Sequence, residues 1–335
     1  MTNQKLITIC IATYNRSKTV ARLVQELLDF ELNDQIEILV IDDCSPDNTF
    51  EELSKFSHHN NVSIFKNKKN LSRARTQLRY FNLCKTEYLI ELPDDDILYK
   101  DGILELLSLL PTLDVDFLAT RWMFHMDSVT AAGSAVGRGS DKVKEISLTN
   151  LRVQSQHSPG CVFRTSILRF SEKYILERLD KDCALAFFYH QFIVLYMAKL
   201  NNLKLSSSPI LLGGYRPEGN LLSNYIDLNG NSYDSLSVSY NIYLGMKHFY
   251  EDMLTKFYDS PLVDELKVIS DAYNLSLYAI IDDAVSYSYD LDDLESKSIG
   301  ESLRVGSIKN IFNPIKGFRY LVRFFVVKLK AMRYK

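Results

Sequence analysis

The chain has 335 residues, of which 46% are hydrophobic and 24% are charged, and its formal net charge is −3. This composition is typical of a soluble globular protein with one large domain and a smaller appendage, and it excludes fibrous and disordered proteins. The charge is uneven, because nine Lys or Arg residues follow Glu301, the last acidic residue. An acidic body with a basic tail argues against a nucleic-acid-binding protein, so we expect no nucleic-acid partner.

Short apolar runs alternate with amphipathic segments over the first part of the chain. The runs are rich in β-branched residues, which predicts strands that are buried on both faces. The predicted strands are 6–12, 36–41, 62–65 and 88–92, and the predicted helices are 18–30, 45–56 and 71–84. This alternation predicts an α/β fold with a parallel sheet, right-handed crossovers and helices on both faces.

Acidic residues follow the second and fourth predicted strands. Asp42 and Asp43 end the second strand, and Asp94, Asp95 and Asp96 follow the fourth. Because ligands of such sheets bind at the carboxyl ends of the strands, we expect these acids to gather at one edge. Oxygen ligands favour Mg²⁺ or Mn²⁺, completed by the phosphate oxygens of a substrate, which indicates a nucleotide-diphosphate site. The alternative is a solvated acidic turn in which Asp96 caps the next helix.

Four motifs carry a family resemblance. They are Ile9–Arg16 (ICIATYNR), Val40–Thr49 (VIDDCSPDNT), Asn70–Arg75 (NLSRAR) and Leu92–Leu98 (LPDDDIL). The chain contains neither a G-x-G-x-x-G after the first strand nor a G-x-x-x-x-G-K-[ST], which disfavours a dinucleotide-binding domain and a P-loop. In these motifs the chain resembles the family 2 glycosyltransferases, of the type that assembles bacterial surface glycans. The resemblance fades after about residue 110.

The resemblance implies a GT-A fold, with a mostly parallel Rossmann-like sheet, and the transfer of a sugar from a nucleotide-diphospho-sugar to an acceptor hydroxyl. The donor would most often be a UDP-sugar, and the transfer would usually invert the anomeric carbon. By position, Ala12 and Tyr14 would line the base and Asp43 would accept the imide N–H of a pyrimidine. Asp42 is the less favoured of the two adjacent acids. Arg75 would approach the diphosphate with its fork of donors, the alternative being a solvated helix face.

The acidic motif departs from the D-x-D that is usual in the family, because Pro93 takes the place of the first aspartate. The resemblance still implies Asp94 near the ribose and Asp95 as a ligand of Mn²⁺ or Mg²⁺. Asp96 would be a second metal ligand or a helix cap.

An inverting transfer needs a general base that removes the proton of the acceptor hydroxyl. The resemblance implies a carboxylate well downstream of the acidic motif, before an aromatic-rich helix. Asp182 is the first candidate and Asp180 the second, while Glu172 and Glu177 are weaker ones. The alternative for the aspartates is a helix N-cap.

The predicted domains are a GT-A glycosyltransferase domain at 1–225, a helical appendage at 226–300 and a basic amphipathic tail at 301–335. Within the first domain, the glycine-rich stretch 213–219 is predicted to be a surface loop near the site.

The tail has the pattern of a basic helix that lies in a membrane interface, the alternative being a helix that docks onto the protein itself. Its apolar stripe is Ile315, Phe318, Val322, Phe325, Leu329 and Met332, and its basic stripe is Lys316, Arg319, Arg323 and Lys330. The five cysteines lack zinc-site spacing, which favours a reducing cytoplasm. No apolar run approaches the about 18 residues that span a bilayer, and no signal peptide is visible. We therefore expect a cytoplasmic enzyme, peripheral at the inner face of the membrane, with a glycan or lipid-linked acceptor.

Three other functions share parts of this sequence pattern. A nucleotidyltransferase shares a similar sheet but should have a glycine-rich, basic loop after the first strand, which is missing here. A receiver domain places its acid pair after the first strand and is far shorter. A catalytically inactive scaffold that binds nucleotide sugars remains the main alternative.

Overall fold

The structure is a computed structural model that describes residues 5–123, 135–136, 140–146, 159–177, 179 and 203–215. These residues lie in the first of two compact units, which comprises Met1–Lys181 and Leu185–Asn220. The predicted appendage, the tail and the candidate bases Asp180 and Asp182 lie outside the described residues. In the described part of the chain, no helix has the length and apolar character that crossing a bilayer requires.

Strands and helices alternate at the start of the chain, as predicted. The strands are β1 (Ile7–Thr13), β2 (Ile36–Asp42), β3 (Val62–Lys66) and β4 (Tyr88–Glu91), and the helices are α1 (Ser17–Leu28), α2 (Thr49–Ser54), α3 (Arg73–Leu78) and α4 (Tyr80–Leu83). The segment 71–84 was predicted as one helix but forms two. The break occurs at Arg79, whose N–H bonds the carbonyl of Thr76 at 3.2 Å and so makes a tighter turn than an α-helix.

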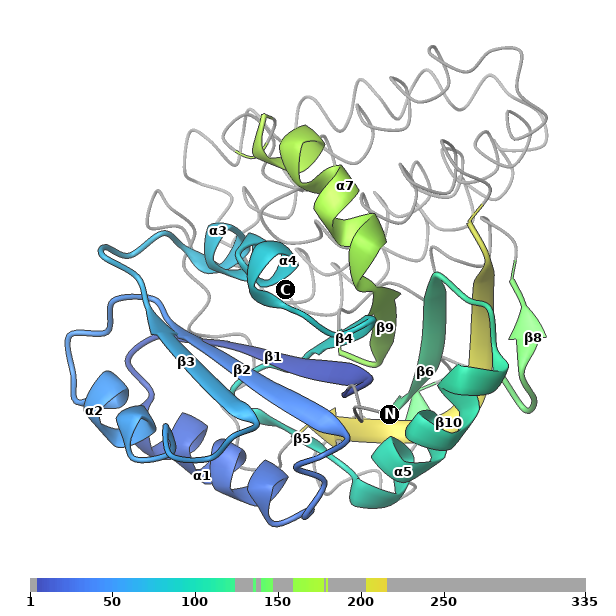
Figure 1. Ribbon diagram of the computed structural model, residues 1–335, viewed down its shortest axis with the longest axis horizontal. Helices are drawn as coiled ribbons and strands as arrows, with labels where there is room; N and C mark the ends of the chain where they lie inside the picture. The colour runs from blue at the N-terminus through green and yellow to red at the C-terminus, as the bar shows by residue number, and fades with distance from the viewer. Residues whose placement is uncertain are drawn as a thin grey trace, which may run out of the picture. The chain divides into compact units, whose positions relative to one another are not determined.

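The later elements complete the same sheet (Figure 1). They are β5 (Asp96–Leu98), α5 (Lys100–Leu109), the 3₁₀ helix η1 (Leu110–Thr112), β6 (Phe117–Met123), β7 (Ala135–Val136), β8 (Lys144–Glu145), β9 (Cys161–Arg164), α7 (Thr165–Leu176) and β10 (Leu205–Tyr215).

The sheet has the strand order β3-β2-β1-β4-β9-β6-β10-β5, with β7 paired to β6 and β8 to β10. The pairs β3–β2, β2–β1 and β1–β4 are parallel, which confirms the predicted α/β architecture of this half. The other half is mixed, because β9 runs antiparallel to both β4 and β6. In Figure 1, α1 and α2 cover one face of the parallel half and α3, α4 and α7 lie on the other.

The apolar runs become the core, as their pattern predicted. Nearly all residues of β1 and β2 are buried, and α1 packs a single face against them. Each Val or Leu side chain buried in this way contributes about 1.5–3 kcal/mol to stability. The buried residues of α1 are Val20, Leu23, Val24, Leu27 and Leu28.

The described glycines of the predicted loop 213–219 instead lie within a strand. Gly213 and Gly214 belong to β10 and pair with β5. A Cβ atom on Gly213 would lie 2.2 Å from the carbonyl oxygen of Ile97, and one on Gly214 would lie 2.6 Å from that of Met123. These glycines therefore mark a close approach between backbones.

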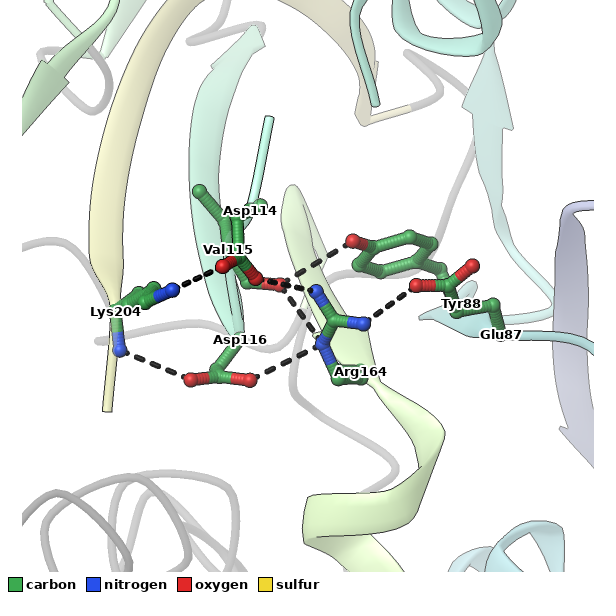
Figure 2. A network of polar contacts seen from close by, with 7 residues as sticks. All are labelled: Glu87, Tyr88, Asp114, Val115, Asp116, Arg164 and Lys204. Atoms are coloured by element: carbon green, nitrogen blue, oxygen red, sulfur yellow. Dashed lines mark hydrogen bonds and ion pairs between the residues drawn. The ribbon is translucent and has the colours of Figure 1, made fainter. Parts of the chain in front are cut away.

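A network of polar side chains lies at the end of the sheet where β4 and β6 begin, opposite the end that carries the acidic motifs (Figure 2). Arg164, the last residue of β9, lies 2.5 Å from Glu87, 3.1 Å from Asp116 and 3.3 Å from Asp114. Its guanidinium also lies over the ring of Tyr88, 5.2 Å from the centroid. Burial raises the pKa of Tyr88 to about 12, although Arg164 opposes this shift. The network ties the ends of β4, β6 and β9 together, so it supports the sheet away from the acidic edge.

Candidate functional site

The carboxyl ends of β1, β2 and β4 meet at one edge of the sheet, as predicted from the strand order. Thr13 is in register with Asp42, and the N–H of Asp43 bonds the carbonyl of Thr13 at 2.9 Å. On the other side of β1, the hydroxyl of Thr13 donates to Oδ2 of Asp94 at 2.7 Å. The two acidic motifs are therefore brought to the two sides of Thr13.

Asp94 and Asp95 share one cation, Arg16. The Nη1 atom of Arg16 lies 2.7 Å from Asp94 Oδ1 and 2.8 Å from Asp95 Oδ2. The side chain of Asp94 is 9% exposed, whereas that of Asp95 is 29% exposed. Burial raises the pKa of Asp94 against the opposing effect of Arg16. Although burial lowers the pKa of Arg16, the two carboxylates outweigh it, and the net shift is upward.

Arg16 had no predicted role, yet it supplies the positive charge that adjacent carboxylates require. The available signal was its position, because a cation that closely follows the first strand lies at the same edge as the acids.

Replacing Arg16 with Met is expected to lower the free energy of unfolding by about 2 kcal/mol, because the buried Asp94 loses its cation. The partial exposure of Arg16 keeps this cost below that of a fully buried pair. Urea unfolding measures the change. The control is Arg22→Met, which removes a surface arginine 4.0 Å from Glu26 and should change stability by less than about 0.5 kcal/mol. Equal losses in the two variants would contradict the role of Arg16.

The two acids after β2 differ in their surroundings. Asp42 is fully buried, and its Oδ1 accepts the N–H of Ser45 at 3.0 Å and also the Ser45 hydroxyl. Asp43 is 5% exposed, and its Oδ1 accepts from Asn67 at 2.6 Å and from the N–H of Leu71 at 2.8 Å. Both acids are therefore buried, Asp42 bonded within its own loop and Asp43 bonded to the segment that follows β3.

The turn after β1 holds the other predicted base-binding residues. Ala12 is half-buried near the end of β1, and Tyr14 is 46% exposed, so its ring is accessible for stacking. Asn15 has a φ of 55°, a left-handed conformation that asparagine tolerates well. Its N–H bonds the hydroxyl of Ser45 at 2.8 Å, which fixes this turn against the loop after β2.

Arg75, predicted at the diphosphate, is half-buried on α3. That helix is attached to β4 through Glu91, a buried carboxylate that had no predicted role. Arg73 lies 3.5 Å from Glu91, and the side-chain amide of Gln77 donates to the same oxygen. The attachment fixes the helix that carries Arg75.

Asp95 and Asp96 were predicted as metal ligands. In the described residues, no three or more His, Cys, Asp or Glu side chains are grouped to hold a metal. A partly exposed carboxylate such as Asp95 nevertheless suits a cation that substrate phosphates complete. Asp96 is buried in β5, and α5 begins at Lys100 after Tyr99, so the alternative in which Asp96 caps that helix is wrong.

Comparison with known proteins identifies related sequences. Residues 8–174 match the model of the family described as glycosyl transferase family 2. The poly(ribitol-phosphate) β-N-acetylglucosaminyltransferase TarS of Staphylococcus aureus is 23% identical over 174 residues, which are 51% of this chain and 30% of TarS. A processive diacylglycerol β-glycosyltransferase of Mycoplasma genitalium is 29% identical over 126 residues, which are 36% of this chain and 37% of that protein. The chain thus spans only about a third of the length of these two curated relatives.

A solved structure shares the fold. The crystal structure of S. aureus TarS 1–349 in complex with UDP-GlcNAc superposes with a TM-score of 0.58 at 17% identity, covering 89% of this chain and 79% of that one. The predicted GT-A fold class is therefore confirmed.

Proposed function

The chain belongs to the family 2 glycosyltransferases through its residues 8–174, and from this premise we propose that it transfers a sugar from a nucleotide-diphospho-sugar to a hydroxyl group. The donor is a UDP-sugar, and the product contributes to a cell-surface glycan. One observation carries the proposal: the carboxyl ends of β1, β2 and β4 bring Thr13, Asp43, Asp94 and Asp95 to one edge of the sheet. The TarS complex with UDP-GlcNAc, which has the same fold, supports this donor class.

The nucleotide end of the donor is bound at the start of the chain. The base stacks on the exposed ring of Tyr14 beside Ala12, and its imide N–H donates to Asp43. Asp94 binds the ribose, for which Thr13 and Arg16 hold its carboxylate in place.

The diphosphate lies between a cationic and an acidic residue. Arg75 donates to the phosphate oxygens, as a guanidinium fork does well. Asp95 would hold Mn²⁺ or Mg²⁺, with Asp96 as the weaker candidate for a second ligand. Such an ion, when bound, would offset the negative charge that develops on the leaving diphosphate.

The acceptor hydroxyl attacks the anomeric carbon from the side opposite the diphosphate, which inverts that carbon. Its proton passes to Asp182, with Asp180 as the second candidate. The acceptor is a glycan or a lipid-linked glycan, and the basic amphipathic tail at 301–335 keeps the enzyme peripheral at the inner face of the membrane.

The proposal is tested by measuring nucleoside diphosphate release from UDP-, GDP-, CDP- and dTDP-sugars, with Mn²⁺ and again with EDTA. We expect release from the UDP-sugar and its loss to background with EDTA, because without a cation the carboxylate of Asp95 would repel the negative charge of the leaving diphosphate. Isothermal titration with the free nucleotides accompanies the assay, so that a missing acceptor is distinguished from a missing site. If the protein shows no release and no metal-dependent nucleotide binding, the proposal is contradicted. Binding of nucleotide sugars without transfer to any acceptor would favour an inactive scaffold.

A further inference from the structure

Asn67 is placed directly behind Asp43. It follows β3, and its N–H extends the ladder to the carbonyl of Asp42 at 2.8 Å. Its side chain is buried, with the residue only 4% exposed. The Nδ2 atom donates to Asp43 Oδ1 at 2.6 Å and to the hydroxyl of Thr76 at 2.9 Å, while Oδ1 accepts from Nη1 of Arg79.

These contacts fix the orientation of the Asn67 amide. Both of its N–H groups have an acceptor and its oxygen has a donor, so its hydrogen-bonding groups are engaged. The reverse orientation would place the amide oxygen against the carboxylate of Asp43 and the NH₂ group against the guanidinium of Arg79. Both contacts would be repulsive, so Asp43 and Arg79 together determine which way Asn67 faces.

The fixed amide in turn determines which oxygen of Asp43 is available. Oδ1 already accepts two hydrogen bonds, from Asn67 and from the N–H of Leu71. Within the described part of the chain, no donor contacts Oδ2 of Asp43. A ligand that reaches Asp43 therefore meets an acceptor that has no hydrogen of its own to donate.

We propose that Asn67, oriented by Arg79, is the positioning residue that gives the site its preference among nucleotide bases. It holds Asp43 so that Oδ2 accepts from a base with a hydrogen on its ring nitrogen, as N3 of uracil has. Cytosine has an unprotonated N3, which would place two acceptors against each other. This inference rests on the proposed function, in which Asp43 meets the base, and it extends that function to residues outside the ligand contact.

The test compares Asn67→Ala with Asn61→Ala by isothermal titration with UDP and CDP. Asn61 is a matched control, because it is a buried asparagine at the other end of β3 and is only 1% exposed. Its main-chain carbonyl accepts the N–H of Ile38 at 2.8 Å, a bond that the substitution keeps. We expect Asn67→Ala to weaken UDP binding by about tenfold, as the loss of one hydrogen bond to a charged group does, while CDP binding changes less. A residue with only a structural role would lower stability without changing the UDP-to-CDP ratio, as we expect for Asn61→Ala.

Arg79 provides a second, milder variant should Asn67→Ala fold poorly. Arg79→Met should shift the UDP-to-CDP ratio in the same direction, and Arg79→Lys should restore part of it because a cationic donor remains. A ratio unchanged from wild type in both Asn67→Ala and Arg79→Met would overturn the inference while leaving the proposed function intact. Failure of the wild-type protein to bind any nucleoside diphosphate would instead overturn the proposed function, and this inference with it.

Discussion

Asp95→Ala is expected to lower the turnover of the donor sugar by about a thousandfold, while the protein stays folded. The proposed role of Asp95 is to hold the cation that offsets the charge of the leaving diphosphate, which is worth several kcal/mol in the transition state. The fold should survive because the side chain is 29% exposed and because Arg16 still pairs with the buried Asp94. Turnover with Mn²⁺, circular dichroism and Mn²⁺ binding in the presence of UDP measure the three effects.

The matched control for this variant is Asp34→Ala. Asp34 is an exposed aspartate that precedes β2, whereas the acidic edge lies beyond the other end of that strand. We expect this variant to turn over the donor at the wild-type rate and to bind Mn²⁺ with UDP normally. Activity near that of the wild type in Asp95→Ala would refute the assignment of Asp95 to the metal.

Asp182→Asn is expected to lower the rate of sugar transfer by about 10²–10⁴-fold, while the affinity for the nucleotide is unchanged. The contacts of Asp43, Asp94 and Asp95 favour a general base that lies elsewhere in the chain. Asp43 is bonded to Asn67, and Asp94 and Asp95 are bonded to Arg16. These side chains therefore already have hydrogen-bond or ion-pair partners within the protein.

The variant that decides between the two candidate bases is Asp180→Asn. Transfer and UDP binding are measured for both variants, and the base is the residue whose loss affects transfer alone. Glu172, a weaker candidate, already accepts from the side-chain amide of Asn82 at 2.8 and 2.9 Å. If Asp180→Asn stops transfer and Asp182→Asn does not, the assignment of Asp182 is wrong.

The parallel half of the sheet was predictable because its signal is local. An apolar run of β-branched residues, as in β1 and β2, has few alternatives to a buried strand. Once the strands alternate with helices, their carboxyl ends must share an edge, and this alone predicts that Asp43 and Asp94 lie at the same edge.

The partners of these acids were harder to predict, since they depend on contacts between distant segments. The bonds from Arg16 to Asp94 and from Asn67 to Asp43 join residues 78 and 24 positions apart. Gly213 was misassigned for a related reason. Glycine favours a loop by composition, and only the neighbouring backbone of Ile97 shows that a strand excludes a side chain there.

The position of β9 has a consequence for how the protein is made. β9 lies between β4 and β6, antiparallel to both, although about forty residues separate it from β6 in the sequence. While the ribosome is still adding residues before Cys161, β4 has only β1 as a neighbour, and its other edge is open to pairing with foreign strands. We therefore expect the newly made N-terminal half to depend on chaperones until Cys161–Arg164 has left the ribosome, when Arg164 joins the two halves through Glu87 and Asp116.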